Sequence, residues 1–84
     1  MKVYILMVED VSDGTRYTNN IDVYLNYDKA KHEFDKLVAE YKEKNDFSHC
    51  DISESSNYFY VESEDSPLLD YLYVDIIEKT VIED

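Results

Sequence analysis

The 84 residues of this chain suffice for one small domain with one hydrophobic core, so we predict a single domain over residues 1–84. Twenty acids against eight bases give a formal net charge of −12. This charge disfavours direct binding to nucleic acid and to anionic membranes, because both are negatively charged. Cys50 is the lone cysteine, which excludes an internal disulfide and indicates a reducing compartment, most simply the cytoplasm.

The first quarter of the chain predicts a β-hairpin. Residues 3–8 form a continuous apolar run of strand length, typical of a strand that is central in a sheet or buried on both faces. Turn-forming residues at 12–15 include the only glycine, so residues 16–25 should return antiparallel. The aliphatic side chains of this second strand alternate onto one face: Ile21, Val23 and Leu25. Tyr24 falls on the other face, which we expect to be the open face of the sheet, so the aliphatic set should face the helix.

A helix is predicted from the residues after Asn26 to about Lys44. Asn26 has the short polar side chain that caps helix N-termini, and Asp28 places an acid in the first turn. Lysines in the last turn suit the negative end of the helix dipole. Apolar residues recur at helical spacing and should pack on a sheet: Ala30, Phe34, Leu37, Val38 and Tyr41.

The second half of the chain predicts a loop and two strands. Residues 46–57 are rich in serine, which is typical of a loop. Residues 58–62 and 71–77 have the aromatic and β-branched composition of strands. The connection between them includes residues 64–67, with the only proline.

The last strand predicts how the layers are arranged. Its aliphatic side chains share one face, which should meet the helix: Leu72, Val74 and Ile76. Its other face, on the open side of the sheet, should carry Tyr71, Tyr73 and Asp75. The elements therefore run β-β-α-β-β, and we predict the α+β class, an antiparallel sheet with one helix packed on one face.

The sequence has no motif for catalysis, a cofactor or a metal. His32, His49 and Cys50 would have to supply any zinc site or nucleophile–base pair, and adjacent residues of an extended segment point to opposite sides. The acidic segment 62–70 lacks the glycine and the bidentate glutamate of a calcium loop. There is no phosphate-binding loop and no nucleophile elbow. We therefore predict that the protein is not an enzyme and has no catalytic residue, cofactor or metal site.

Charge and tyrosine content indicate a protein partner instead. Residues 45–84 carry eleven acids and one base, a net charge of −10, whereas residues 1–44 carry −2. Such asymmetry produces a field that steers a basic partner toward one surface. Tyrosine is a good strand former, and it is also enriched at protein–protein interfaces. The predicted partner-binding residues are Glu62, Glu64, Asp65, Asp70, Tyr71, Tyr73, Asp75 and Tyr24.

In size, acidity and lack of motifs, the chain resembles small acidic phage-encoded inhibitors of the anti-CRISPR or DNA-mimic type. The resemblance covers the whole chain through its composition and transfers no site residue. It implies an inhibitor in the host cytoplasm that blocks a basic nucleic-acid-binding partner, such as a nuclease complex, by presenting carboxylates in place of phosphates. Residues two apart on a strand, such as Glu62 and Glu64, lie ~6.6 Å apart, a spacing comparable to that of phosphates along a nucleic acid.

The alternative is an acidic interaction module without nucleic-acid mimicry, such as an immunity protein, an antitoxin or a regulatory subunit. The sequence also leaves a homodimer open, through an exposed edge of the strand that starts at Tyr71. Charged residues on that strand would then guard the edge against uncontrolled pairing: Asp75, Glu78 and Lys79.

Overall fold

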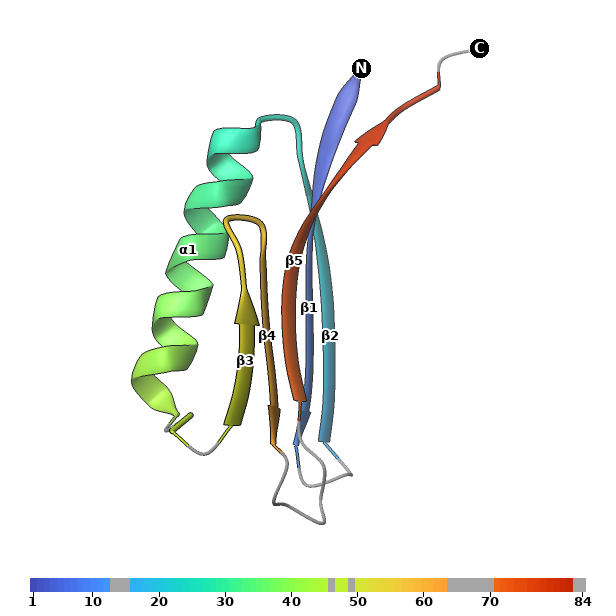
Figure 1. The fold of residues 1–84 in the computed structure, drawn as a ribbon. Helices are drawn as coiled ribbons and strands as arrows, with labels where there is room; N and C mark the ends of the chain where they lie inside the picture. The colour runs from blue at the N-terminus through green and yellow to red at the C-terminus, as the bar shows by residue number, and fades with distance from the viewer. Residues whose placement is uncertain (13–15, 46, 49, 64–70, 83–84) are drawn as a thin grey trace.

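A computed structural model describes residues 1–12, 16–45, 47–48, 50–63 and 71–82. Its elements in chain order are β1 (Lys2–Ser12), β2 (Arg16–Tyr24), α1 (Tyr27–Lys44), β3 (Cys50–Glu54), β4 (Tyr58–Ser63) and β5 (Tyr71–Thr80). Figure 1 shows α1 lying along one face of the sheet, and all neighbouring strands pair antiparallel. The predicted α+β class is therefore confirmed. The expected turn residues 13–15 and the connection 64–67 lie outside the described residues.

The strand order is β2-β1-β5-β4-β3, so β1 and β5 occupy the middle of the sheet. A central position for β1 agrees with its continuous apolar run. The prediction that β5 offers a free sheet edge is wrong, because β5 pairs with β1 on one side and with β4 on the other. Asp75 therefore lies within the sheet and guards no edge. Among the described strands, the edges belong to β2 and β3.

The serine-rich segment predicted as a loop contains β3, which pairs with β4. A tight turn joins these strands, where Ser55 N donates a hydrogen bond to Tyr58 O over 2.9 Å. Every side chain of β3 after Cys50 is exposed. Cys50 and Ile52 are the two apolar residues of this five-residue strand, and so short an alternation does not distinguish a strand from a loop.

The helix begins and ends as predicted. The Asn26 side chain accepts a hydrogen bond from Asp28 N over 2.7 Å, which satisfies one of the free donors of the first turn. At the other end Asn45 N donates to Tyr41 O over 3.1 Å. Ala30 and Phe34 are buried against the sheet, and Leu37, Val38 and Tyr41 pack around them, as the spacing predicted.

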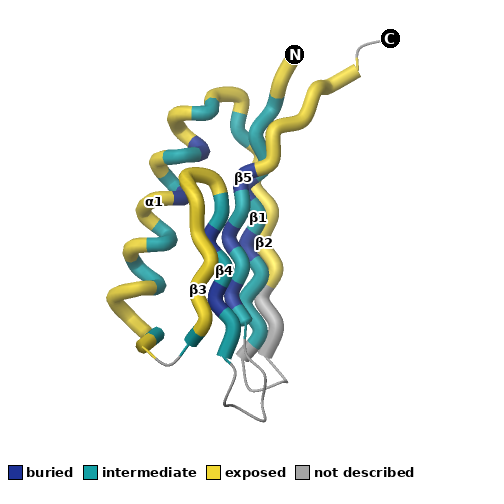
Figure 2. The backbone as a smooth tube through the Cα atoms, viewed as in Figure 1, coloured by how far each residue is buried: buried dark blue, intermediate teal, exposed yellow. Residues whose placement is uncertain are grey.

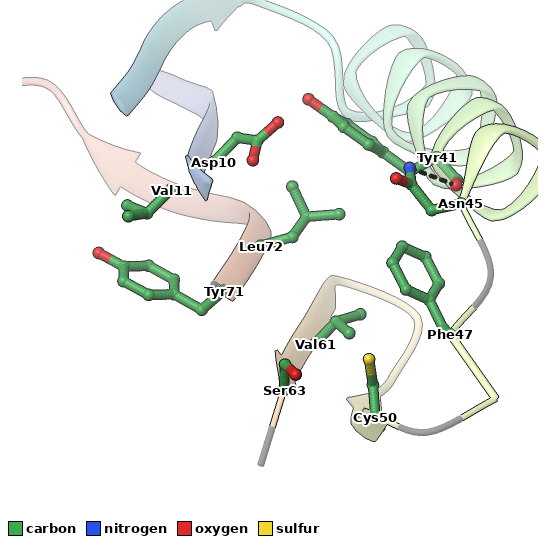
Figure 3. Close-up of a pocket in the computed structure, with 10 residues that line it drawn as sticks. All are labelled: Asp10, Val11, Tyr41, Asn45, Phe47, Cys50, Val61, Ser63, Tyr71 and Leu72. Carbon is green, nitrogen blue, oxygen red and sulfur yellow. Dashed lines mark hydrogen bonds between the residues drawn. The ribbon is translucent and has the colours of Figure 1, made fainter. Parts of the chain in front are cut away.

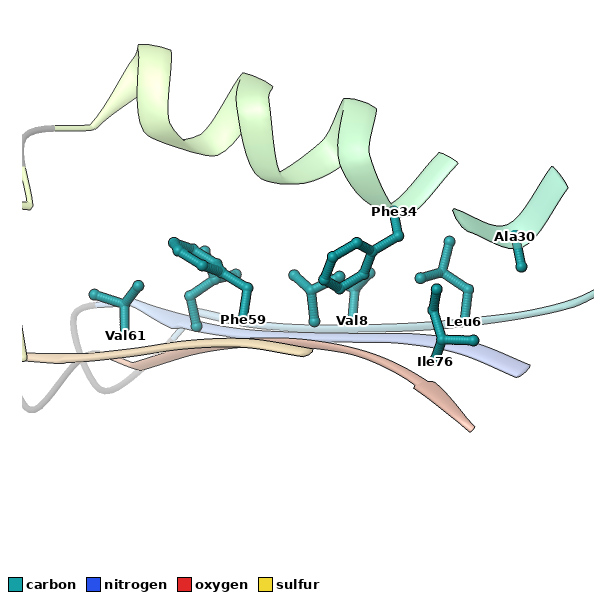
Figure 4. Packing of buried hydrophobic residues seen from close by; sticks show 9 residues of the cluster. Leu6, Val8, Ala30, Phe34, Phe59, Val61 and Ile76 are labelled. Atoms are coloured by element: carbon teal, nitrogen blue, oxygen red, sulfur yellow. The ribbon is translucent and has the colours of Figure 1, made fainter. Parts of the chain in front are cut away.

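The core lies between α1 and the sheet (Figure 2) and is made of aliphatic and phenylalanine side chains. Figure 4 shows the strand side chains of this core projecting toward α1, and Ala30 and Phe34 of α1 projecting toward the sheet. Phe59 and Val74 are fully buried at the centre. The predicted inward set of the last strand is confirmed, since Leu72, Val74 and Ile76 are all buried. The alternate residues of β5 consequently lie on the other face of the sheet, which α1 does not cover.

Candidate functional site on the open face of the sheet

The open face of the sheet brings tyrosines and carboxylates together. On β4 and β5 the buried residues alternate with residues that point away from α1. Glu9 of β1 lies opposite Tyr73 and so joins the same face. We call the following seven residues the tyrosine–carboxylate surface: Glu9, Tyr58, Tyr60, Glu62, Tyr71, Tyr73 and Asp75.

The register of the strands interleaves the two kinds of side chain on this surface. Tyr73 lies between Glu9 on one neighbouring strand and Tyr60 on the other. Elsewhere in the β4–β5 ladder, Tyr71 lies opposite Glu62 and Tyr58 lies opposite Asp75. Directly opposite residues have Cβ atoms only ~4.5–5.5 Å apart, so each carboxylate is next to a phenol ring.

Contacts among the rings organise the surface. The Tyr60 ring stacks on Tyr71 with centroids 6.3 Å apart, and it meets Tyr73 edge to face at 6.0 Å. Such aromatic pairs contribute about 0.5–1.5 kcal/mol beyond the area they bury. The Tyr71 hydroxyl also donates a hydrogen bond to Glu9 Oε2 over 3.4 Å. The surface therefore consists of tyrosine rings in contact with one another and carboxylates that lie beside them.

Burial and neighbouring carboxylates raise the pKa values of two phenols on this surface. Partial burial raises the pKa of Tyr60, and the charge of Glu62 together with a hydrogen bond to it raises this pKa further. Burial likewise raises the pKa of Tyr73, with the Asp75 carboxylate as the next cause. Both phenols remain protonated at neutral pH and can donate hydrogen bonds.

Four of the predicted partner-binding residues are brought together here: Glu62, Tyr71, Tyr73 and Asp75. Three others fall outside the described residues: Glu64, Asp65 and Asp70. Sequence reasoning did not include Tyr58, Tyr60 and Glu9 in the site. Alternation with buried Phe59 and Val61 could have placed the two tyrosines on this face, whereas Glu9 joins it only through the pairing of β1 with β5.

The prediction that Tyr24 shares this face is wrong. In the β1–β2 ladder, Tyr24 lies opposite Tyr4. Two residues along each strand, Asp22 lies opposite Leu6, which is buried beneath the helix. Opposite residues of an antiparallel pair share a face, so Tyr24 is on the helix side. Burial there raises its pKa, and the helix residue Glu33 is the next cause. The hairpin register thus overrides the expectation that the aliphatic residues of β2 face the helix.

The helix and the tyrosine–carboxylate surface differ in net charge. The helix carries five lysines and five acids, including a Lys31–Asp35 ion pair of 2.8 Å, so its net charge is zero. Lys42 bridges to Glu54 of β3 over 3.1 Å. Among the described residues, no lysine belongs to the tyrosine–carboxylate surface. Its three carboxylates therefore give it a local negative charge.

A cavity of about 250 Å³ lies between the C-terminal end of α1 and the sheet (Figure 3). Its lining residues are Asp10, Val11, Tyr41, Asn45, Phe47, Cys50, Val61, Ser63, Tyr71 and Leu72. The Cys50 thiol and the Asp10 carboxylate lie on opposite sides of it and do not converge. Small-molecule pockets usually enclose ~300–1,000 Å³, so this cavity is a weaker candidate than the open face.

Within the described ranges, no group of three or more His, Cys, Asp or Glu side chains is placed to hold a metal ion. The same part of the chain contains no helix with both the length and the apolar character needed to cross a bilayer.

Comparisons with known proteins identify no relative of this chain. No protein-family model, no curated protein and no solved structure matches it.

Proposed function

We propose that this protein is an acidic inhibitor that binds a basic, nucleic-acid-binding partner through the tyrosine–carboxylate surface. The observation that supports the proposal is the interleaving of Glu9, Glu62 and Asp75 with four tyrosines on a face that no described element covers. The type of inhibitor we propose is phage-encoded or carried by a mobile element, and it acts in the host cytoplasm against a defence or nuclease complex. It performs no catalysis and needs no cofactor.

The chemistry of the surface suits arginine-rich and lysine-rich grooves that normally hold nucleic acid. Carboxylates on three adjacent strands attract such a groove over a distance and form ion pairs on contact. Phenol rings offer large, rigid contact area and bind guanidinium groups through their faces. Glu9 and Asp75 are diagonal neighbours across the β1–β5 ladder, a separation of ~7–8 Å in an antiparallel pair. That separation resembles the spacing of phosphates along a nucleic acid strand.

The experiment is affinity capture from a host lysate with the purified protein, before and after nuclease treatment. We expect a basic protein to be captured in both samples, to be released by rising salt, and to be displaced by competing duplex DNA. The salt effect follows from screening of exposed charges. Capture that disappears on nuclease treatment would contradict the proposal, because nucleic acid would then bridge the two proteins.

The second candidate is an acidic interaction module that does not mimic nucleic acid, such as an immunity protein, an antitoxin or a regulatory subunit. The stacked rings of Tyr60 and Tyr71 favour it, because an aromatic layer serves a protein interface and is not needed to imitate phosphates. The same capture experiment separates the two candidates. A complex that persists at high salt and is indifferent to competing DNA would support the interaction module.

A further inference from the structure

The cavity at the C-terminal end of α1 (Figure 3) has an apolar wall that the fold holds in place. The Phe47 ring packs on the fully buried Phe59, with ring centroids 6.1 Å apart. Cys50 N donates a hydrogen bond to Phe47 O over 3.1 Å, which positions the cysteine beside this ring. The buried residues Val61 and Leu72 complete the wall. An apolar surface for a ligand is therefore already formed.

A carboxylate lines the cavity from a side of β1 that is otherwise apolar beneath the helix. Asp10 lies opposite the buried Leu72, so it is on the helix side of the sheet. Leu6 and Val8 occupy the preceding positions of the same side, and both are buried. Asp10 is half-buried, and it is the one charged side chain among the described residues that line the cavity. One end of the cavity is therefore anionic.

The end of the helix adds to this negative potential. Tyr41 and Asn45 line the cavity at the C-terminal end of α1, where carbonyl groups without helical partners form the negative end of the helix dipole. Burial raises the pKa of Tyr41, and the charge of Asp10 is the next cause. Lys42 of the last turn is not a lining residue and pairs with Glu54 over 3.1 Å. The cavity accordingly favours a cation over an anion.

We propose that this cavity binds a small primary amine with an apolar body, in its ammonium form. The ammonium group pairs with the Asp10 carboxylate, and the apolar body packs against Phe47, Val61 and Leu72. A volume of about 250 Å³ holds about eight atoms of the size of water, at ~30 Å³ each. An arylalkylamine of that size, such as benzylamine, matches both the volume and the charge of the cavity.

The amine site is separate from the surface that carries the proposed function. Its charged and apolar contacts are on the helix side of the sheet, whereas the tyrosine–carboxylate surface is on the opposite face. Tyr71 borders both, but its hydroxyl is bonded to Glu9 on the open face and takes no part in holding the amine. Amine binding requires no partner protein, so either proposal can fail while the other holds.

The test is a titration of the isotope-labelled full chain with benzylamine, followed by NMR chemical shifts of the backbone amides. We expect saturable shifts centred on Phe47, Cys50 and Leu72, with a Kd of about a millimolar, because so small a ligand makes few contacts. Benzyl alcohol keeps the size without the charge, and methylamine keeps the charge without the ring. Each should bind at least tenfold more weakly than benzylamine. Benzoate, an anion of similar size, should show no saturable binding.

Two variants test the residues assigned to the site. Asp10→Asn should weaken benzylamine binding at least tenfold. Asp22→Asn is the matched control, because Asp22 is an exposed acid on the same side of the neighbouring strand and does not line the cavity. It should leave binding unchanged. Ser63→Leu should abolish binding, since Ser63 lines the cavity opposite Cys50 and a larger side chain there fills it. Circular dichroism establishes that each variant is folded.

Cys50 provides a second readout, because it is the lone cysteine of the chain and lines the cavity. Saturating benzylamine should slow alkylation of its thiol by iodoacetamide at least threefold, whereas the same concentration of benzyl alcohol should protect it less.

The ligand series on the unmodified chain keeps the proposal falsifiable even if a variant does not fold. Absence of saturable benzylamine binding at tens of millimolar would overturn the proposal. Equal binding of benzylamine and methylamine would also overturn it, because cations would then be attracted only by the net charge of −12. The same conclusion would follow if Asp10→Asn and Asp22→Asn lost affinity equally. Shifts confined to the open face would place the amine outside the cavity and would likewise count against this site.

Discussion

The Tyr71 hydroxyl and Glu9 Oε2 are joined by a hydrogen bond of 3.4 Å between residues 62 positions apart in the chain. This bond lies on the open face, where β1 meets β5. Holding a carboxylate in place before a partner arrives lowers the entropy lost on binding. The acids of this surface are consequently expected to matter more for association than for folding.

Neutralising the surface should therefore separate binding from stability. In the triple variant with Glu9→Gln, Glu62→Gln and Asp75→Asn, affinity for the captured basic partner should fall by orders of magnitude. The association rate should lose most of its dependence on salt, because the steering field is removed. The melting temperature should hold or rise, since like charges no longer repel. Surface plasmon resonance at several salt concentrations and thermal melts measure the two effects.

The matched control removes four acids from the helix: Glu33, Asp35, Glu40 and Glu43. Their amide variant loses local pairs such as Lys31–Asp35, each of which contributes about 0.2–0.5 kcal/mol to helix stability. We expect slightly lower stability and nearly intact binding. Equal loss of affinity in both variants would mean that total charge alone governs association.

Phe34→Ala should destabilise the fold by roughly 3–5 kcal/mol, because the ring fills the space between α1 and the sheet and is 3% exposed. Denaturant unfolding followed by circular dichroism measures this change. Leu25→Ala is the control, since Leu25 is 74% exposed and should change stability by less than about 0.5 kcal/mol. Similar costs for the two variants would contradict the packing described for α1.

Asn26→Ala should cost about 1 kcal/mol, because the variant loses the hydrogen bond that the Asn26 side chain accepts from Asp28 N. Asn26→Ser keeps an oxygen that can accept the same bond and should retain most of the stability. Thermal unfolding of both variants checks the prediction. Equal destabilisation by alanine and serine would show that the cap contributes little.

Stability should decline above about pH 10, the ordinary pKa of tyrosine. Burial raises the pKa values of Tyr60 and Tyr73 in the folded protein, with nearby carboxylates adding to the shift. Their contribution to stability is complete below the unfolded pKa and is lost as pH rises toward the folded values, because the unfolded chain ionises first. Melting temperatures across alkaline pH measure this loss.

The double variant Tyr60→Phe, Tyr73→Phe cannot ionise at these two positions. Its melting temperature should therefore fall less steeply between neutral and alkaline pH than that of the unmodified chain. An identical slope for the two proteins would contradict the effect assigned to these phenols.

Local sequence patterns were sufficient to predict the helix and the faces of the last strand. The Asn26 cap and the helical spacing of Ala30 and Phe34 are contained within a few residues, and so is the alternation that separates Tyr73 from Val74. The fold class followed from these elements, because a sheet face and a helix face bury each other.

Features that depend on strand pairing could not be predicted in this way. The side on which Tyr24 lies is fixed by its register with Tyr4, and the place of Glu9 in the candidate site is fixed by its pairing with Tyr73. Both relationships join separate strands, and β1 and β5 lie far apart in the sequence. The edge strand β3 has two alternating apolar residues, Cys50 and Ile52, which are too few to distinguish it from the loop that its serine-rich segment predicts.

The ladder between β1 and β5 runs from Lys2 opposite Thr80 to Val11 opposite Tyr71. All other strand pairs join neighbours in the sequence, so each can form by closing a short loop. The β1–β5 ladder closes a loop of most of the chain, and the entropic cost of closure rises with loop length. Contacts of such long sequence separation slow folding. The docking of the β1–β2 hairpin onto β5 is consequently the step most able to limit the refolding rate.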